Sequence, residues 1–169
     1  DGKNLFHTGH KNLLGGATSA LSADSLKKAI QLFLDQVDAD GQPISVEPKF
    51  LLVPTALKHL AIELTQGATL IMAGGTENTV RPALNVLADE HLSVVSSPYL
   101  GNSAYEGASQ TGWYLFGDPK TIDTWEIGFL KGKRTPTVER GETDFNTLGL
   151  WFRVYFDLGV REQDHRGMV

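Results

Sequence analysis

The chain has 169 residues, of which 41% are hydrophobic and 21% are charged, and its formal net charge is −5. This length suits one domain, or one domain with a projecting lobe, and the composition is ordinary for a globular protein. The negative balance argues against a specific nucleic-acid partner, the lack of cysteine excludes disulfides and thiolate metal sites, and no apolar run is long enough to span a membrane.

The first elements are a polar segment and a helix. Residues 1–21 are rich in glycine and small polar side chains, and we interpret them as a loosely held arm or linker anchored at residues 5–6. Ser22 can cap a helix in which apolar residues recur at helical spacing as far as Val37. A turn around Gly41 is expected to end this helix.

A strand that runs directly into a helix is predicted next. Residues 50–53 form a short apolar run between two prolines, which is typical of a buried strand. Pro54 fits the first turn of a second helix that reaches Thr65. The side chains expected on its inner face are Leu57, Leu60, Ala61 and Leu64.

The middle of the chain alternates between polar and apolar stretches. Residues 66–78 and 96–112 are rich in glycine and are expected to be loops. Between them, two short strands are predicted at residues 84–87 and 92–95. Together with the two helices, these strands predict an α+β fold class.

The last third of the chain is expected to be β structure. Strands are predicted at residues 113–116 and 124–131, and the second presents Trp125, Ile127 and Phe129 on one face. A connection rich in glycine and charge, residues 132–147, follows them.

The strongest pattern in the sequence lies at residues 148–160. Every second residue is apolar, which predicts a strand buried on one face that extends about 43 Å at about 3.3 Å per residue. The alternate row offers Trp151, Arg153, Tyr155 and Asp157 to another sheet, a helix or another subunit.

Several short patterns resemble functional sites without meeting their requirements. Residues 36–47 imitate a calcium loop, but the segment begins with a glutamine and is followed by Pro48, so a helix-ending turn is favoured. Ser103 and Ser109 lie near glycines, yet neither completes the G-x-S-x-G elbow of a hydrolase. A hydrolase with dispersed catalytic residues stays as a third hypothesis.

Metal and ligand sites have equally weak support. His7 and His10 are three residues apart but have no third ligand near them in the sequence, so no zinc site is predicted. We expect no catalytic residue, no cofactor and no metal. The aromatic residues of the late strands leave one alternative function open, a module that binds carbohydrate or another ligand on an aromatic sheet.

A small basic cluster is formed by Lys131, Lys133 and Arg134. Glu139 and Glu142 balance it within a few residues, so we interpret it as a solvated turn or as a charge-paired contact with a neighbouring subunit.

Taken in order, these patterns resemble the major capsid proteins of tailed phages, which share the Hong Kong ninety-seven fold. The resemblance rests on the capped helix, on residues 50–54 leading into a helix, and on the late strands that end in Gly159-Val160-Arg161-Glu162. Residues 2–7, with His10 and Asn12, are similar to Mu-like major head subunits and to capsid proteins fused to a prohead protease.

The resemblance implies a non-enzymatic structural subunit of a phage or prophage icosahedral shell that encloses DNA. Such a protein is assembled in the cytoplasm of the bacterial host and is located in the virion capsid. Its implied partners are copies of itself in pentamers and hexamers, with a scaffold or a prohead protease as further candidates.

The resemblance also implies a division of the chain. Residues 1–21 would be an arm or linker, 22–122 an axial-like α/β domain, 123–162 peripheral-like long strands, and 163–169 a return segment. We expect the family's N-terminal arm, extended loop and spine helix to be missing from this sequence. The expected subunit contacts are Trp151, Arg153, Tyr155, Asp157, Arg161, Glu162, Lys131 and Arg134.

Overall fold

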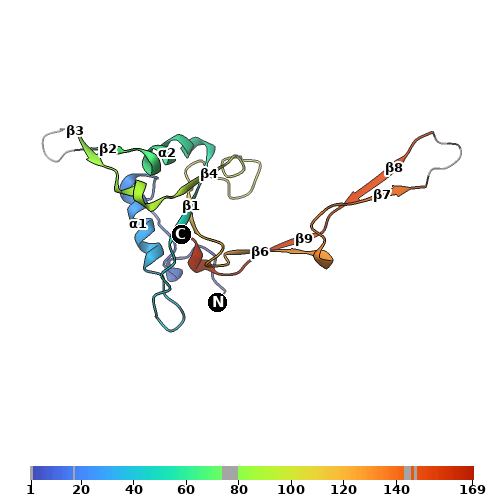
Figure 1. Ribbon diagram of the computed structural model, residues 1–169, viewed down its shortest axis with the longest axis horizontal. Helices are drawn as coiled ribbons and strands as arrows, with labels where there is room; N and C mark the ends of the chain where they lie inside the picture. The colour runs from blue at the N-terminus through green and yellow to red at the C-terminus, as the bar shows by residue number, and fades with distance from the viewer. Residues whose placement is uncertain (1, 17, 74–79, 143–145, 147) are drawn as a thin grey trace. The chain divides into compact units, whose positions relative to one another are not determined.

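A computed structural model of the chain describes residues 2–16, 18–73, 80–142, 146 and 148–169. The chain divides into two compact units. Unit 1 comprises Asp1–Thr124 and Asp164–Val169, and unit 2 comprises Trp125–Gln163, so unit 2 is inserted into the chain of unit 1. Helices and small sheets occur together, which confirms the α+β class (Figure 1).

Helix α1 (Ala23–Leu34) begins where the sequence predicts. Ser22 and Ser25 cap it reciprocally, because the side chain of each accepts a hydrogen bond from the backbone N–H of the other. The helix ends before the predicted Val37, which instead forms a β-bridge with Pro43. Its fully or nearly fully buried apolar side chains are Leu26, Ala29, Ile30 and Phe33.

The turn that follows α1 satisfies its own polar groups. The Asp38 carboxylate accepts hydrogen bonds from the backbone N–H groups of Asp40, at 2.9 Å, and Gln42, at 2.8 Å. Gly41 has a φ of +82°, a left-handed conformation that glycine adopts without strain. The acidic pattern of residues 36–47 is therefore explained by a helix-ending turn.

The central sheet of unit 1 has three strands in the order β4-β1-β5. Strand β1 (Pro48–Pro54) pairs in parallel with β4 (Ser93–Ser97) and in antiparallel fashion with β5 (Tyr114–Gly117). This pairing confirms the strands predicted at residues 50–53, 92–95 and 113–116. Leu51, Val53 and Leu115 are fully buried and belong to the same core cluster as the inner face of α1.

The helix after β1 begins later than the sequence suggests. Pro54 ends the strand, a 3-10 turn η2 (Thr55–Leu57) follows, and only then does α2 (Lys58–Gln66) begin. Ala61 and Leu64 are buried as predicted, but Leu60 is 37% exposed, so its inward placement is wrong. The buried stripe consists of Ala61, Leu64 and Thr65, at helical spacing, and Leu60 lies beside it.

The segment after α2 contains a hairpin that was expected to be a loop. Strands β2 (Thr69–Ala73) and β3 (Val80–Leu84) pair in antiparallel fashion, and residues 74–79 lie outside the described residues. The strand predicted at residues 84–87 is wrong beyond Leu84, because a 3-10 helix η3 (Val86–Glu90) begins there.

The buried side chain of Asn85 explains this change of structure. Its amide donates hydrogen bonds to the carbonyls of Leu64 and Gly67, at 2.8 Å each, and its oxygen accepts one from the Leu87 N–H at 3.0 Å. Asn85 thereby ties the end of α2 to the start of η3.

The residues between β4 and β5 form the loop predicted at 96–112.

The two ends of the chain pack together within unit 1. Asn12 is fully buried, and its amide donates to the carbonyls of Leu5, at 2.9 Å, and His165, at 3.3 Å. The rings of His10 and His165 are stacked with their centroids 3.9 Å apart. These contacts join η1 (Thr8–His10) to η5 (His165–Gly167).

The terminal segments are therefore part of the core rather than appendages. Val169 and Leu115 exchange backbone hydrogen bonds of 2.8 and 3.1 Å, and Met168 is fully buried. The Phe6 ring contacts that of Tyr114 at 5.3 Å between centroids. Within the described part of residues 1–21, the expectation of a loosely held arm is wrong for residues 5–12, because the buried Asn12 side chain and the ring contacts of Phe6 and His10 hold them to the rest of unit 1.

Acidification is expected to destabilise unit 1 through the histidine stack. Burial and the adjacent His10 lower the pKa of His165, with Arg166 and Lys3 acting in the same direction and Asp164 against them. The unfolded chain then binds a proton at higher pH than the folded chain, so stability is full above the ordinary histidine pKa of about 6.5 and declines as the pH falls below it.

Thermal melts between pH 7.5 and pH 5 measure this effect. His165→Gln should flatten the dependence of the melting temperature on pH, whereas His59→Gln, on the exposed surface of α2, should leave it unchanged. An unaltered pH slope in His165→Gln would count against the stack as its source.

Unit 2 consists of two antiparallel ribbons. Strand β6 (Trp125–Phe129) pairs with β9 (Leu158–Glu162), and β7 (Thr137–Gly141) pairs with β8 (Trp151–Tyr155) (Figure 1). A short 3-10 turn η4 (Leu130–Gly132) follows β6. Strand β7 lies in the stretch that was predicted to be a connection.

The single long strand predicted at residues 148–160 is wrong. It is divided into β8 and β9 at residues 156–157, where the Asp157 carbonyl accepts a hydrogen bond of 3.4 Å from the Leu130 N–H. The burial of its apolar row is also wrong, since every residue of β8 and β9 is exposed.

Candidate interaction surface

The register of β7 and β8 sorts their side chains onto two faces. Glu139 lies opposite Arg153, and Thr137 lies opposite Tyr155. Directly opposed residues project to the same side of a ribbon, and side chains alternate along each strand. One side, which we call the mixed face, therefore carries Thr137, Glu139, Trp151, Arg153 and Tyr155, and the other carries Val138, Arg140, Phe152 and Val154.

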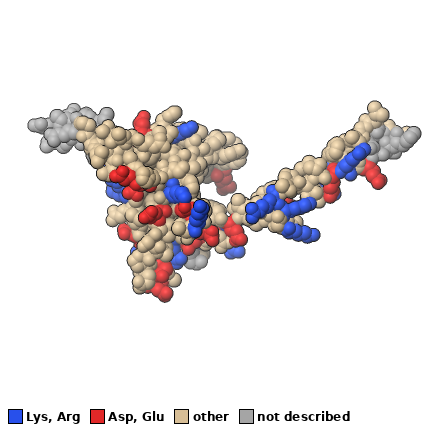
Figure 2. Space-filling model, viewed as in Figure 1, with Lys and Arg blue, Asp and Glu red and all other residues tan. Residues whose placement is uncertain are grey.

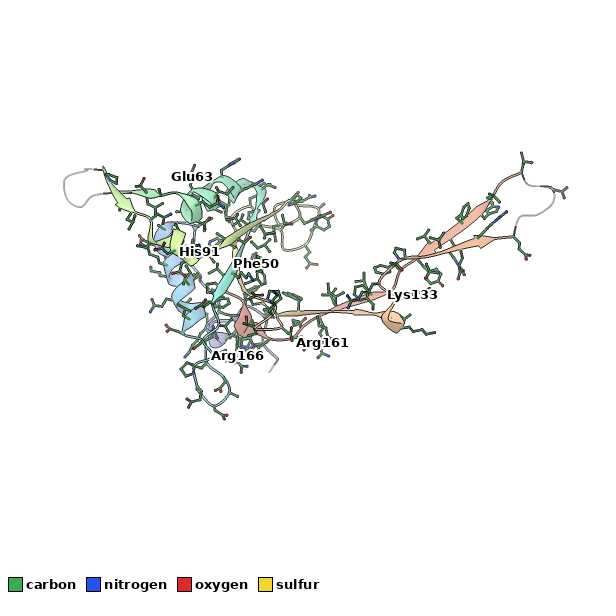
Figure 3. The ribbon with its side chains drawn as sticks, viewed as in Figure 1. Phe50, Glu63, His91, Lys133, Arg161 and Arg166 are labelled. Atoms are coloured by element: carbon green, nitrogen blue, oxygen red, sulfur yellow. The ribbon has the colours of Figure 1, made fainter. Side chains whose placement is uncertain are left out.

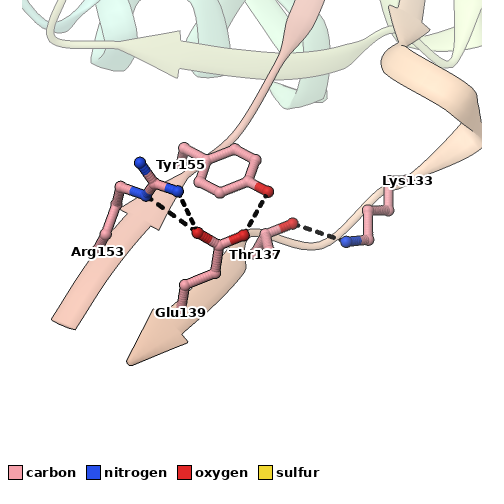
Figure 4. A network of polar contacts seen from close by, with 5 residues as sticks. All are labelled: Lys133, Thr137, Glu139, Arg153 and Tyr155. Atoms are coloured by element: carbon pink, nitrogen blue, oxygen red, sulfur yellow. Dashed lines mark hydrogen bonds and ion pairs between the residues drawn. The ribbon is translucent and has the colours of Figure 1, made fainter. Parts of the chain in front are cut away.

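Glu139 organises the mixed face (Figure 4). One carboxylate oxygen accepts hydrogen bonds from Nε, at 3.1 Å, and Nη2 of Arg153, and the other accepts one of 3.0 Å from the Tyr155 hydroxyl. The Arg153 guanidinium also lies 5.6 Å from the centroid of the Tyr155 ring. Beside them, Lys133 donates to the Thr137 hydroxyl at 2.8 Å.

These contacts orient exposed groups rather than bury them. They hold the pKa of Glu139 below its usual range, first through Arg153 and then through Tyr155, and raise that of Arg153. The Arg153 side chain is still 74% exposed and Trp151 is 65% exposed. An exposed ion pair contributes little to stability, so the arrangement is better suited to presenting a guanidinium and aromatic rings to another surface.

The two sides of the β6–β9 ribbon differ more clearly in polarity than those of the β7–β8 ribbon. Trp125, Ile127 and Phe129 of β6 lie opposite Glu162, Val160 and Leu158 of β9. We call this side, made of Trp125, Ile127, Phe129, Leu158 and Val160, the apolar face. The reverse side carries Glu126, Gly128, Gly159 and Arg161.

All eight residues expected to make subunit contacts are exposed residues of unit 2, but they do not share one face. Trp151, Arg153 and Tyr155 lie together on the mixed face. The other five are distributed over η4 and the residues just after it, the break between β8 and β9, and both sides of β9; they are Lys131, Arg134, Asp157, Arg161 and Glu162. Figure 3 labels Arg161 on β9 and Lys133 beside η4.

The sequence interpretation missed two parts of this surface. Glu139, the centre of the polar network, was regarded only as a charge that balances the basic cluster. The apolar face was missed as a contact surface. The alternation of Trp125, Ile127 and Phe129 already indicated that these three side chains lie on one side of a strand.

The patterns that imitated catalytic and metal sites have structural explanations. Ser109 accepts hydrogen bonds from the backbone of Thr111, at 3.2 Å, and Gly112, at 2.9 Å, and so serves as a turn residue. Among the described residues, no group of three His, Asp or Glu side chains is arranged to hold a metal. In the same part of the chain, every helix is too short or too polar to cross a bilayer.

The sequence model of the family described as phage capsid protein matches residues 1–169. The chain belongs to the phage capsid protein family. This capsid protein is a structural, non-enzymatic subunit of the virion capsid, and it assembles with copies of itself. Neither the curated proteins nor the solved structures contain a match to it. Its family favours the structural interpretation over the carbohydrate-binding and hydrolase alternatives.

Proposed function

We propose that this capsid protein forms an icosahedral shell of the Hong Kong ninety-seven type, in which unit 2 supplies contacts between subunits. The observation that carries the proposal is the exposure of every residue of β8 and β9, apolar and aromatic residues included. An isolated two-stranded ribbon is marginally stable, and large exposed apolar patches mark interaction sites. Contact with a second subunit would cover these side chains.

The two units differ in ways that support different roles within the shell. Unit 1 has a hydrophobic core cluster of its own, as a domain gathered around pentamer and hexamer centres requires. Unit 2 offers exposed ribbons, as the peripheral strands of such a subunit do. In this proposal unit 1 contains the axial-like domain expected at residues 22–122, and unit 2 the peripheral-like strands expected at 123–162. A Mu-like head subunit, acting with a scaffold or a prohead protease, fits this arrangement.

The mixed face is the proposed centre of one subunit contact. Trp, Tyr and Arg are the residue types most enriched at the energetic centres of protein interfaces, and Trp151, Tyr155 and Arg153 occur here on one side of one ribbon. Glu139 holds the Arg153 guanidinium and the Tyr155 hydroxyl in place before contact, which reduces the entropy lost on binding. Lys131, Arg134, Asp157, Arg161 and Glu162 would act elsewhere on unit 2 as charges that orient a partner.

Electron microscopy of the product of the complete gene tests this proposal. Closed shells or tubes of uniform curvature are expected in negative stain. A matched control replaces residues 125–163 with a short Gly-Ser linker between Thr124 and Asp164. Because the Asp164 N–H donates to the Asp123 carbonyl at 3.2 Å, the two attachment points lie close together, and unit 1 should fold without assembling. Only small monodisperse particles of the folded wild-type protein, or shells from the control, would contradict the proposal.

A further inference from the structure

The apolar face of the β6–β9 ribbon carries opposite charges at its two ends. At one end, Glu162 lies directly opposite Trp125 and on the same side of the ribbon. At the other end, the Arg134 guanidinium lies 5.7 Å from the centroid of the Phe129 ring, and Lys131 stands in the adjoining turn η4. With about 3.3 Å per residue along β6, the acidic and basic ends are about 13 Å apart. Figure 2 shows Lys and Arg side chains gathered on the part of unit 2 that contains η4.

The reverse side of the same ribbon lacks this polarity. There, Glu126 lies directly opposite Arg161, so the two charges are cross-strand neighbours within one chain. The rest of that side is formed by Gly128 and Gly159, which offer no side chain to a partner. The apolar face is therefore the side of this ribbon that can gain most from contact with a second surface.

We propose that two copies of the capsid protein stack the apolar faces of their β6–β9 ribbons in antiparallel orientation about a two-fold axis. In a two-fold contact, the residue that meets a second residue in one direction is met by it in the other. Antiparallel stacking therefore places Glu162 of each copy against Arg134 and Lys131 of the other. Parallel stacking would place like charges together at both ends. The inference rests on the proposed function, because it assigns a specific partner surface to unit 2.

Burial and charge have separate roles in this contact. Trp125, Ile127, Leu158 and Val160 are each between 46% and 57% exposed, so stacking two such faces removes apolar surface from water on both copies. The terminal charges select the orientation rather than supply the main attraction. Unit 2 contains equal numbers of acidic and basic residues, so two copies of it meet without net repulsion.

Charge reversal at either end of the apolar face tests the inference. Glu162→Arg and Arg134→Glu each place like charges at both ends of the two-fold contact, and each should weaken association between copies by at least about tenfold in sedimentation analysis. An equal mixture of the two variants should associate as the wild type does, because every end-to-end pair then joins opposite charges. Glu63→Arg, on the exposed surface of α2 (Figure 3), is the matched control and should have no effect.

The outcomes separate this inference from the proposed function. If the wild type assembles and both single variants assemble equally well, or if their mixture does not recover, the two-fold stacking is overturned while shell formation stands. If the folded wild type does not assemble, the proposed function fails and the inference fails with it.

Cross-linking supplies a second measurement that does not depend on charge. The chain contains no cysteine, so Arg134→Cys and Glu162→Cys introduce unique thiols. Mild oxidation of a mixture of the two variants should give a disulfide-linked pair of copies, more than either variant gives alone. Absence of the mixed pair from assembled particles would overturn the proposed contact.

Discussion

Phe33→Ala should lower the free energy of unfolding of unit 1 by about 3–5 kcal/mol. The Phe33 side chain is fully buried on the inner face of α1. Strand β5 approaches it so closely that a Cβ at Gly117 would lie 3.3 Å from the tip of the ring. Removing the ring therefore leaves a cavity between α1 and the central sheet, and a backbone held by hydrogen bonds cannot collapse to fill it. Thermal and urea unfolding, followed by circular dichroism, measure the loss.

The next residue in the same helix provides the control for this prediction. Leu34 is 45% exposed, so Leu34→Ala removes a large apolar side chain from the same element without opening a cavity. Its expected cost is under about 1 kcal/mol. Equal losses from the two substitutions would contradict the packing of α1 against the sheet.

The elements of unit 1 that could be predicted are those with strong local signals. Ser22 followed by an apolar stripe fixes the start of α1, and an apolar run between Pro48 and Pro54 fixes β1. What could not be predicted depends on contacts between distant residues. Asn12 is one polar side chain in a polar segment, and nothing near it in the sequence indicates that it bonds to His165.

The long strand shows a different limit of sequence patterns. An apolar residue at every second position continues without interruption from Leu148 to Val160, because this spacing records which side each residue faces. It does not record which strand lies alongside. The chain changes partner from β7 to β6 at residues 156–157, and Leu130, far away in the sequence, bonds to the backbone there.

Only part of the candidate contact surface could be predicted, because alternation gives the side of a strand on which a residue lies but not the strand that pairs with it. Alternation alone places Trp151, Arg153 and Tyr155 on one side of a strand, and the register of β8 agrees with this. The position of Glu139 opposite Arg153 requires β7, which carries only a short and polar strand signal, Thr-Val-Glu-Arg-Gly. The apolar face likewise emerges only when β6 is paired with β9, because Trp125 and Glu162 are far apart in the sequence.

Arg153→Glu is expected to prevent the formation of regular shells while leaving unit 1 folded. The substitution removes the guanidinium from the mixed face and places a second carboxylate directly opposite Glu139. Like charges at directly opposed positions destabilise a ribbon, and a repelled partner surface loses orientation and affinity. Electron microscopy and sedimentation measure assembly, and the circular dichroism melt of the variant should match that of the wild type for unit 1. Normal shells from this variant would contradict the contact role of Arg153.

A charge-swapped double variant distinguishes contact with a neighbour from support of the ribbon. Glu139→Arg combined with Arg153→Glu restores opposite charges across β7 and β8 but moves the positive charge to the other strand. If Arg153 meets a second copy of the capsid protein, the double variant should still assemble poorly. Recovery of normal shells would instead limit Arg153 to an internal pairing role. Lys28→Glu, a charge reversal on the exposed side of α1, should assemble normally and shows whether any added negative charge is harmful.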